Sequence, residues 1–228
     1  MPNLMRFSMD TAGLQAAVAS NSRERGASSL CRAAFWEEAL ELLALSSRVL
    51  LVTGFYIRGA GACETDGPPG AVILGRALAR TGKRVVLLTD RRNYECLRAC
   101  SRSVGGPPVA RVDDPSQVSM RMDLLIFIER PGRAADGRYY NMRGVDISDV
   151  VAPLDDLAEI AGGRGVPVLS IGDGGNEAGM GALYDSLLEA LPSRYAGCIS
   201  KVPSRVCLPV DVSNWGGYAL AALLSSFY

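Results

Sequence analysis

Four short apolar runs recur along the chain, and they constrain its fold more than any other feature. They span residues 48–55, 84–90, 123–130 and 166–171. Each is almost continuously apolar, which is typical of strands in a parallel sheet that is covered on both faces. Two weaker runs, 109–112 and 206–212, predict shorter strands. Because Pro209 cannot donate a ladder hydrogen bond, the last of these is expected at a sheet edge.

Segments with helical spacing of apolar residues separate these runs. We expect helices over residues 31–45, 71–81, 91–103, 154–161, 182–191 and 218–227. Strands that alternate with helices predict an α/β fold, namely a three-layer, doubly wound, mostly parallel sheet with helices on both faces (Rossmann-like). The length of 228 residues suits a single domain over 1–228, with 1–30 as a partly irregular N-terminal extension that has a loop at 21–29.

Composition narrows the classes of partner. Lys plus Arg and Asp plus Glu both number 24, and 48% of the residues are hydrophobic. This balance is ordinary for a soluble globular protein and predicts neither a nucleic-acid nor a membrane partner.

The six cysteines form no CxxC pair, and no secretory signal is evident. We therefore expect an intracellular protein of the mitochondrial matrix or cytosol, not a secreted one. The sequence does not decide whether the chain forms a homo-oligomer.

The chain contains no histidine. The commonest general base and the commonest metal ligand are therefore both missing. A Ser-His-Asp triad and a histidine-bearing zinc site are excluded. Acid–base chemistry must fall to carboxylates, Lys, Tyr or Cys.

The segment IGDGGNEAGMG, residues 171–181, joins a predicted strand to a predicted helix. Its glycines leave backbone N–H groups open to a ligand. Asn176 could cap the helix, and Glu177 suits its first turn. A strand, a glycine-rich turn and a helix N-terminus make a common ligand-binding corner, although a tight, well-capped turn explains the same residues. The glycine spacing does not fit a dinucleotide-binding fingerprint.

Polar residues gather after the predicted strands, where open α/β sheets bind their ligands. Convergence of the carboxylates in these loops would require a bound cation, a shared proton or an ammonium ligand. For Asp66, a structural role as a helix cap or as the ion-pair partner of a nearby arginine fits better than a role in ligand binding. A divalent cation, Mg²⁺ or Ca²⁺, would bind Asp173 and Glu177. The carboxylates are Glu64, Asp66, Glu129, Asp173 and Glu177.

Three segments then become recognisable. They are ETDGPPGA from Glu64, IERPGRAADGRYYNMRGVDIS from Ile128 and SIGDGGNEAGMG from Ser170. Together they resemble the D-glutamate cyclase family, specifically its C-terminal domain, and VTGFYI from Val52 and the turn at 213–216 look like the same family. The resemblance spans about residues 30–228. Fuller members of the family carry an additional N-terminal domain that this sequence does not include.

The resemblance implies an enzyme that converts D-glutamate, a small-molecule substrate, to 5-oxo-D-proline plus water. Glu129 or Asp173 would deprotonate the ammonium, and the N–H groups of Gly174 and Gly175, or a cation, would offset charge on the attacked carboxylate. The expected catalytic residues are Glu129, Asp173 and Glu177. The expected ligand-binding residues are Glu64, Thr65, Asp66, Gly67, Arg130, Arg133, Asn141, Arg143, Gly174, Gly175 and Asn176, of which Arg130, Arg133 and Arg143 would grip a substrate carboxylate.

Two other classes of function fit the same residues. One is a non-catalytic α/β module that binds an acidic amino acid or a nucleotide. The other is a phosphate-handling enzyme with Mg²⁺ between Asp173, Glu177 and phosphate groups, since glycine-rich turns also suit phosphate.

Overall fold

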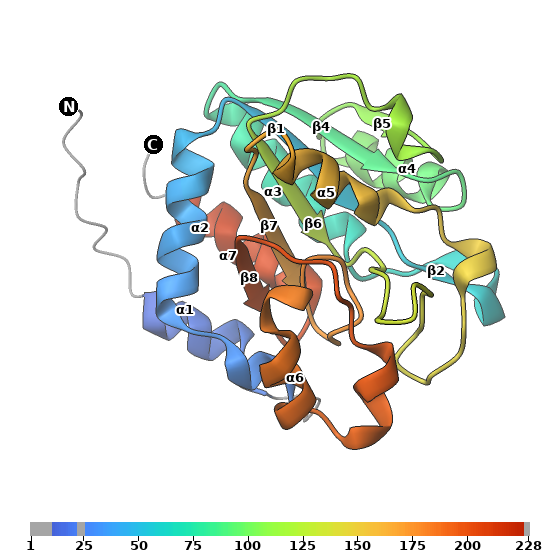
Figure 1. Cartoon of the computed structure of the whole chain (residues 1–228). Helices are drawn as coiled ribbons and strands as arrows, with labels where there is room; N and C mark the ends of the chain where they lie inside the picture. Colours follow the sequence, from blue (N-terminus) through green and yellow to red (C-terminus); the bar gives the residue numbers. More distant parts are fainter. Residues whose placement is uncertain (1–10, 22–25, 226–228) are drawn as a thin grey trace.

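A six-stranded sheet forms the centre of the computed structural model, which describes residues 11–21 and 26–225. All neighbouring strands pair in parallel, in the order β5-β4-β1-β6-β7-β8 (Figure 1). This confirms the predicted doubly wound α/β fold and places the last strand at an edge. The strands are β1 (Arg48–Thr53), β4 (Arg84–Thr89), β5 (Val109–Arg111), β6 (Leu124–Ile128), β7 (Val168–Gly172) and β8 (Val206–Pro209).

The strand order reverses between β1 and β6. The chain builds outward from β1 through β4 to β5, and then returns to β6 on the other side of β1 and continues to β7 and β8. Thr53 at the end of β1 pairs with Ile128 at the end of β6. The loops after these two strands therefore diverge from neighbouring points, which is where doubly wound sheets open a binding crevice.

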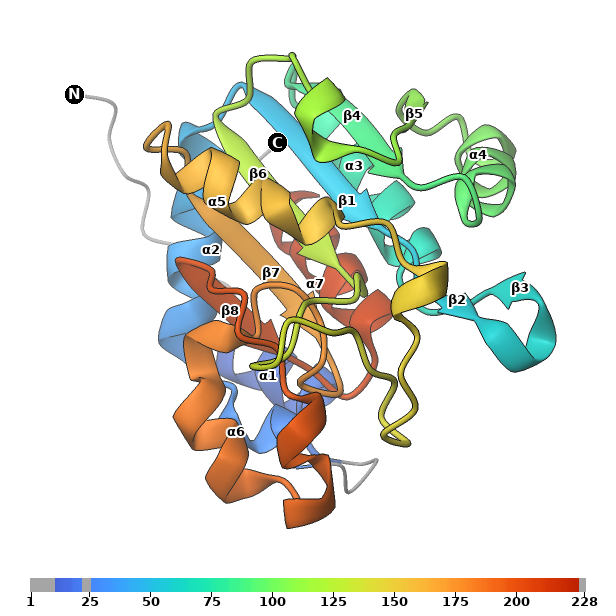
Figure 2. The ribbon, with the colours of Figure 1, turned by 45° about the vertical axis from the view of Figure 1, so that its right-hand side comes forward.

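Helices cover both faces of the sheet (Figures 1 and 2). Val49 and Leu51 of β1 pack in one apolar core with α2, α3 and α7, whereas Leu50 and Val52 pack in a second core with α5. Both faces of the central strands are buried, as their continuous apolar runs predict. The helices are α1 (Thr11–Val18), α2 (Ala33–Leu45), α3 (Pro68–Arg80), α4 (Tyr94–Ser103), α5 (Leu157–Gly162), α6 (Tyr184–Ala190) and α7 (Ser213–Ser225).

Short elements occupy several predicted loops. Within the predicted loop after β1, strands β2 (Tyr56–Ile57) and β3 (Ala62–Cys63) form a small antiparallel ribbon. The remaining elements are the 3-10 helices η1 (Ala27–Leu30), η2 (Arg58–Ala60), η3 (Pro115–Gln117), η4 (Ser148–Val150), η5 (Leu154–Asp156), η6 (Gly181–Leu183) and η7 (Ser193–Cys198).

Part of the N-terminal extension expected over 1–30 forms a helix and packs on the domain, while positions 1–10 of it lie outside the described residues. Helix α1 packs against α2 and α7, and the hydroxyls of Ser20 and Ser28 donate to Asp211 beyond β8. These long-range contacts have no local signal in the sequence. Of the loop expected at 21–29, positions 22–25 lie outside the described residues, as do positions 226 and 227 of the expected closing helix.

Helix α7 begins at Ser213, five residues before the predicted start at 218. Gly216 and Gly217, which favour a turn, lie inside the helix at points where neighbours leave no room for side chains. A Cβ atom at Gly216 would lie 2.5 Å from Cγ2 of Ile171 on β7, and Gly217 faces α3. A Cβ atom at Gly217 would lie 2.7 Å from the carbonyl oxygen of Gly70 and 2.8 Å from its Cα. Tertiary packing therefore overrides the low helix propensity of glycine.

Along the described stretches of chain, 11–21 and 26–225, no helix combines the length and apolarity needed to cross a membrane.

The α3–α7 contact predicts that Gly217→Ala destabilises the protein. The added methyl group would collide with the backbone of Gly70, and overpacking of this kind costs about 1–3 kcal/mol, partly offset by about 1 kcal/mol of helix propensity. Because the clash is with backbone atoms, we expect the upper part of this range, about 2–3 kcal/mol, and therefore a net loss of about 1–2 kcal/mol in the free energy of unfolding, measured by urea denaturation. Gly162→Ala is the matched control, because a Cβ atom there meets open space. Equal stability of the two variants would contradict the close-packing account.

Candidate functional site

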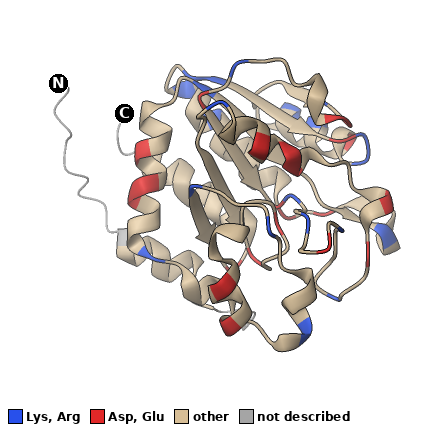
Figure 3. Cartoon of the chain, viewed as in Figure 1, with Lys and Arg blue, Asp and Glu red and all other residues tan. Residues whose placement is uncertain are grey.

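Three carboxylates from distant segments meet at the switch point of the sheet. Asp66 precedes α3, Glu129 directly follows β6, and Asp173 directly follows β7. One oxygen atom from each side chain lies within 4.8 Å of the other two. Glu129 and Asp173 are buried and Asp66 is half-buried. We call Asp66, Glu129 and Asp173 the carboxylate cluster; both acidic and basic residues occupy the surrounding loops (Figure 3).

Glu129 is the most constrained member of the cluster. Its backbone has a φ of 47°, in the left-handed region that non-glycine residues rarely adopt. Its N–H donates to Ile171 on β7 and its carbonyl accepts from Gly54 after β1, each at 3.2 Å. Strained residues held in this way cluster at functional sites.

The Glu129 side chain lies in a strongly unfavourable place for a negative charge. Burial raises the pKa of Glu129 well above its usual value, and the charges of Asp173, Glu177, Asp66 and Glu64 raise it further. The Ser213 hydroxyl lies 2.5 Å from Oε2 of Glu129 and donates to it. Sequence reasoning missed this role of Ser213, although a serine at the start of a helical segment is a recognisable N-terminal signal.

Asp66 caps the N-terminus of α7 from a position 147 residues earlier in the chain. Its Oδ1 accepts the Asn214 N–H at 2.6 Å, and its Oδ2 accepts the Ser213 N–H at 3.0 Å. Asn214 returns the contact, since its Oδ1 accepts the N–H groups of Gly67 and Gly70 in the first turn of α3. The N-terminus of α7 thus holds the Asp66 side chain in place beside Glu129. The expectation of a cap for Asp66 is met, although its partner is a helix end rather than an arginine.

Gly67 allows this approach. It has a φ of 96°, and a Cβ atom there would lie 2.6 Å from Cβ of Glu129 and 2.8 Å from Oγ1 of Thr53. Its neighbours Glu64 and Thr65 are half-buried and exposed, respectively. Thr65 contributes its carbonyl oxygen, which accepts the side-chain amide of Asn214.

Glu177 belongs to the glycine-rich loop, and its side chain binds backbone N–H groups of the same loop. Its carboxylate accepts the N–H groups of Asp173 at 3.3 Å and of Gly174 and Gly175 at 2.8 Å each. The expectation that the amides of Gly174 and Gly175 face a substrate is therefore not met, because an internal carboxylate occupies them. Asp173 groups with Asp66 and Glu129 instead of Glu177, which corrects the predicted metal pair.

The glycine-rich loop also joins the loop that follows β6. The side-chain amide of Asn176 donates to the Tyr140 carbonyl at 2.8 Å, and the N–H of Gly132 donates to the Asn176 carbonyl at 2.9 Å. Asn176 therefore does not cap the next helix, α6, which begins only at Tyr184. These contacts keep the two loops together over the ends of β6 and β7.

Arg130 does not face a ligand as predicted. Its side chain is fully buried, and Nη1 donates to Asp90 at 2.5 Å and to the Gly54 carbonyl at 3.2 Å. Nη2 donates to the Ala152 carbonyl at 2.5 Å. The guanidinium thus connects the ends of β6, β1 and β4 with the segment before α5. A buried charge of this kind must be paired, and here Asp90 and two backbone carbonyls engage both terminal nitrogens, whereas Nε has no hydrogen-bond partner among the described residues.

The other two predicted arginines differ in exposure. Arg133 is paired with Asp155 at 3.1 Å and also with Asp156. Arg143 is exposed in the loop after β6, where its N–H donates to Oδ1 of Asn141 at 2.9 Å. This loop covers the glycine-rich turn, since a Cβ atom on Gly174 would lie 2.9 Å from Cγ of Met142. Of the three arginines, Arg143 is exposed, whereas Arg130 is buried and Arg133 is ion-paired.

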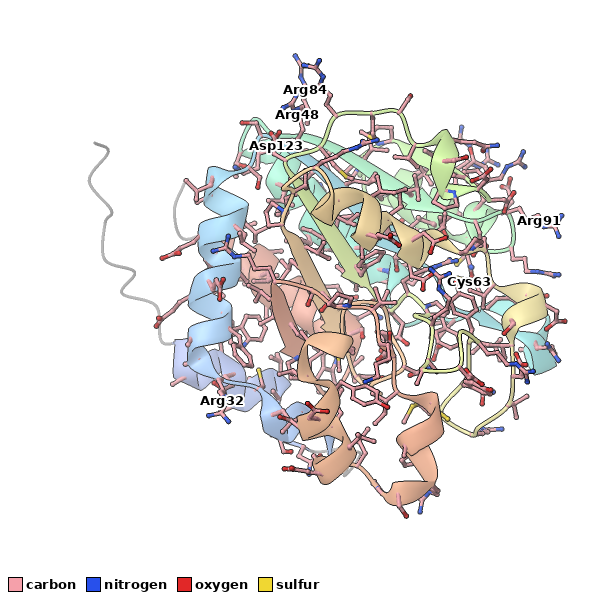
Figure 4. The ribbon with its side chains drawn as sticks, in the orientation of Figure 1. Arg32, Arg48, Cys63, Arg84, Arg91 and Asp123 are labelled. Carbon is pink, nitrogen blue, oxygen red and sulfur yellow. The ribbon has the colours of Figure 1, made fainter. Side chains whose placement is uncertain are left out.

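The opposite end of the sheet has a different character. There Arg48 pairs with Asp123 at 2.6 Å and connects the starts of β1 and β6. Figure 4 shows both residues far from Cys63, which lies in the β2–β3 ribbon just before the acidic loop. The strained backbone and the clustered carboxylates therefore belong to the carboxyl end of the sheet.

Comparisons with known proteins agree with this geometry. A family model described as "D-glutamate cyclase-like, C-terminal" matches residues 14–227. The chain is also similar to the Homo sapiens protein "D-glutamate cyclase, mitochondrial", with 34% identity over 225 residues. That match covers 87% of this chain but 36% of the human protein, so the chain spans about a third of its relative's length.

The hydrogen bonds of Glu177 predict a structural role for its charge. Glu177→Gln would replace one acceptor oxygen with an amide group that faces a backbone N–H. Because a buried hydrogen bond to a charged group contributes about 1.5–3 kcal/mol, we expect a loss of about 2–3 kcal/mol in the free energy of unfolding, measured by urea denaturation. Glu189→Gln, at an exposed position of α6, should change it by less than about 0.5 kcal/mol. A Glu177→Gln protein as stable as this control would show that the loop does not depend on the carboxylate.

Proposed function

The chain belongs to the D-glutamate cyclase-like C-terminal family, and from this premise we propose that it converts D-glutamate to 5-oxo-D-proline plus water. The observation that carries the proposal is the convergence of Asp66, Glu129 and Asp173 at the switch point of the sheet. In a chain without histidine, such a cluster is the strongest available source of acid–base chemistry.

The chemistry requires proton transfer but no net gain or loss of protons. The α-amino nitrogen attacks the γ-carboxyl carbon, a C–N bond forms, and a C–O bond breaks. The ammonium nitrogen gives up two protons, and the departing oxygen takes up two as it leaves as water. A carboxylate that accepts a proton from nitrogen and returns it to oxygen therefore suffices. We assign this transfer to Glu129 or Asp173.

The surroundings of the cluster suit the other parts of the substrate. The ammonium group is attracted by the carboxylates, whose mutual repulsion it relieves. Arg143 is our choice for the α-carboxylate, because Arg130 is buried against Asp90 and Arg133 is paired with Asp155 and Asp156. The Glu177 carboxylate remains the internal support of the glycine-rich loop. The proposal thus keeps Glu129 and Asp173 in the reaction and gives Glu177 a positioning role.

The cellular setting is part of the proposal. The human relative is mitochondrial by its name, and we place this chain in the same compartment.

A binding module is the second candidate. It is favoured by one observation, namely that the chain matches only 36% of the human protein's length. On this alternative, the crevice holds D-glutamate and another part of a longer protein completes the reaction.

Asp173→Asn tests the proposed reaction. We expect the purified wild-type chain to form 5-oxo-D-proline from D-glutamate. Chiral liquid chromatography measures the amount of this product. Because a general acid or base typically contributes about 10²–10⁴-fold, Asp173→Asn should lower kcat/KM by at least about 100-fold. Asp185→Asn, an exposed position on α6, is the matched control and should keep full activity.

Three outcomes discriminate the candidates. Loss of turnover in Asp173→Asn alone supports the cyclase. Unimpaired turnover in both Asp173→Asn and Glu129→Gln would rule out a catalytic role for the cluster. An inactive wild-type chain whose melting temperature rises with D-glutamate would identify the binding module, since a ligand stabilises the folded state that binds it.

A further inference from the structure

We propose that the carboxylate cluster and the hydroxyl of Thr53 together form a binding site for a hard divalent cation, of the Mg²⁺ or Mn²⁺ type. The site itself rests on geometry alone. Its use in catalysis, described below, rests on the proposed function.

The spacing of the cluster suits a single ion. The three ligand oxygens of Asp66, Glu129 and Asp173 lie within 4.8 Å of one another. Oxygen ligands bind Mg²⁺ at about 2.0–2.1 Å and Ca²⁺ at about 2.3–2.6 Å, so two oxygens on opposite sides of an ion are about 4–5 Å apart. One cation can therefore contact all three carboxylates with little movement of the side chains.

Thr53 provides an independent indication of a ligand. It is fully buried at the end of β1, and its Oγ1 has no hydrogen-bond partner among the residues that the structure describes. The neighbouring buried threonine, Thr89, does have one, because its hydroxyl donates to the Thr53 carbonyl at 2.7 Å. A buried hydroxyl without a partner costs about 1–3 kcal/mol, which a bound cation would recover.

The Thr53 hydroxyl lies beside the cluster. A Cβ atom built on Gly67 would be 2.8 Å from Oγ1 of Thr53 and 2.6 Å from Cβ of Glu129. The hydroxyl is therefore close to the backbone at Gly67, next to Asp66, and to the first side-chain carbon of Glu129. Because a side chain at Gly67 would overlap both neighbours, the glycine lets these ligand-bearing segments approach one another.

Fixed partners orient the proposed ligands. The N–H groups of Ser213 and Asn214 hold Asp66, and the Ser213 hydroxyl holds one oxygen of Glu129. Each carboxylate oxygen has more than one lone pair, so these hydrogen bonds leave acceptor capacity for a cation. Metal sites commonly orient their ligands through such outer contacts. With four oxygen donors and no sulfur or nitrogen, the site favours a hard cation over zinc or copper.

A cation here would supply what the glycine-rich loop does not. Because Glu177 occupies the N–H groups of Gly174 and Gly175, another positive group must offset the charge of the attacked γ-carboxylate. In the proposed reaction, a divalent cation would polarise that carboxylate as a Lewis acid. The carboxyl end of the sheet would then hold both the reacting carboxylate and the proton-transfer group.

Manganese binding tests the site without any measurement of activity. The full chain is titrated with MnCl₂, and the electron paramagnetic resonance signal of free Mn²⁺ reports the bound fraction. We expect one Mn²⁺ per chain, displaced by excess Mg²⁺. Asp173→Asn should weaken binding by at least about tenfold, and Thr53→Val, which replaces the hydroxyl with a methyl group, should weaken it severalfold, whereas Asp185→Asn should bind as the wild type does.

Circular dichroism melting shows which variants are folded. If Asp173→Asn does not fold, Thr53→Val, which keeps the shape of the side chain, carries the test of the site. Absence of stoichiometric Mn²⁺ binding, or equal affinity in the wild type and both site variants, would overturn the proposal. The two proposals fail separately. Stoichiometric Mn²⁺ binding without turnover removes the cyclase and keeps the cation site, whereas turnover without Mn²⁺ binding removes the cation site and keeps the cyclase. Turnover that persists in excess EDTA removes the use of the cation in catalysis.

Discussion

The close approach of helices α3 and α7 is the constraint on which the site depends. The Gly70–Gly217 contact lets the two helix backbones nearly touch, so that both N-termini arrive at the same point. Across this junction Asp66 accepts the Asn214 N–H, the Asn214 Oδ1 accepts the Gly70 N–H, and the adjacent Ser213 hydroxyl donates to Glu129. A wider spacing between α3 and α7 would move Asp66 away from Glu129, and the three carboxylates would no longer meet. The close packing of glycines thus determines which carboxylates meet at the carboxyl end of the sheet.

The protein compensates each buried carboxylate in a different way. Asp66 is stabilised by a helix N-terminus, and Glu177 by three backbone N–H groups. Asp90 is paired with Arg130. Glu129 has a raised pKa and accepts a hydrogen bond from the Ser213 hydroxyl, so it has much to gain from a positively charged ligand. This difference in compensation separates the carboxylates that support the site from those we propose to act in it.

Much of the fold could be predicted because its signals are local. Continuous apolar runs indicated buried parallel strands, and polar residues after them indicated the ligand-binding end of the sheet. The start of α7 was wrongly predicted at 218, since the reasons for glycines at 216 and 217 are distant in sequence, namely Ile171 on β7 and the backbone of Gly70 on α3.

The site was predictable in its segments but not in its pairings. The acidic loops were named correctly, yet nothing local shows that Arg130 turns inward to Asp90 or that Glu177 accepts the amides of its own loop. Thr53 appeared only as a strand residue, because its burial without a partner depends on the neighbouring β6 and the loop at Gly67. Convergence across the sheet decides these roles, and only three-dimensional structure displays it.

The central claim is that three distant segments form one site for a small acidic substrate. A crystal structure of the chain with 5-oxo-D-proline measures this most directly. The account predicts product density within hydrogen-bonding distance, about 3 Å, of Glu129 or Asp173, with the three cluster carboxylates converging on it. Carboxylates that point to separate surfaces, or product bound away from the switch point between β1 and β6, would contradict it.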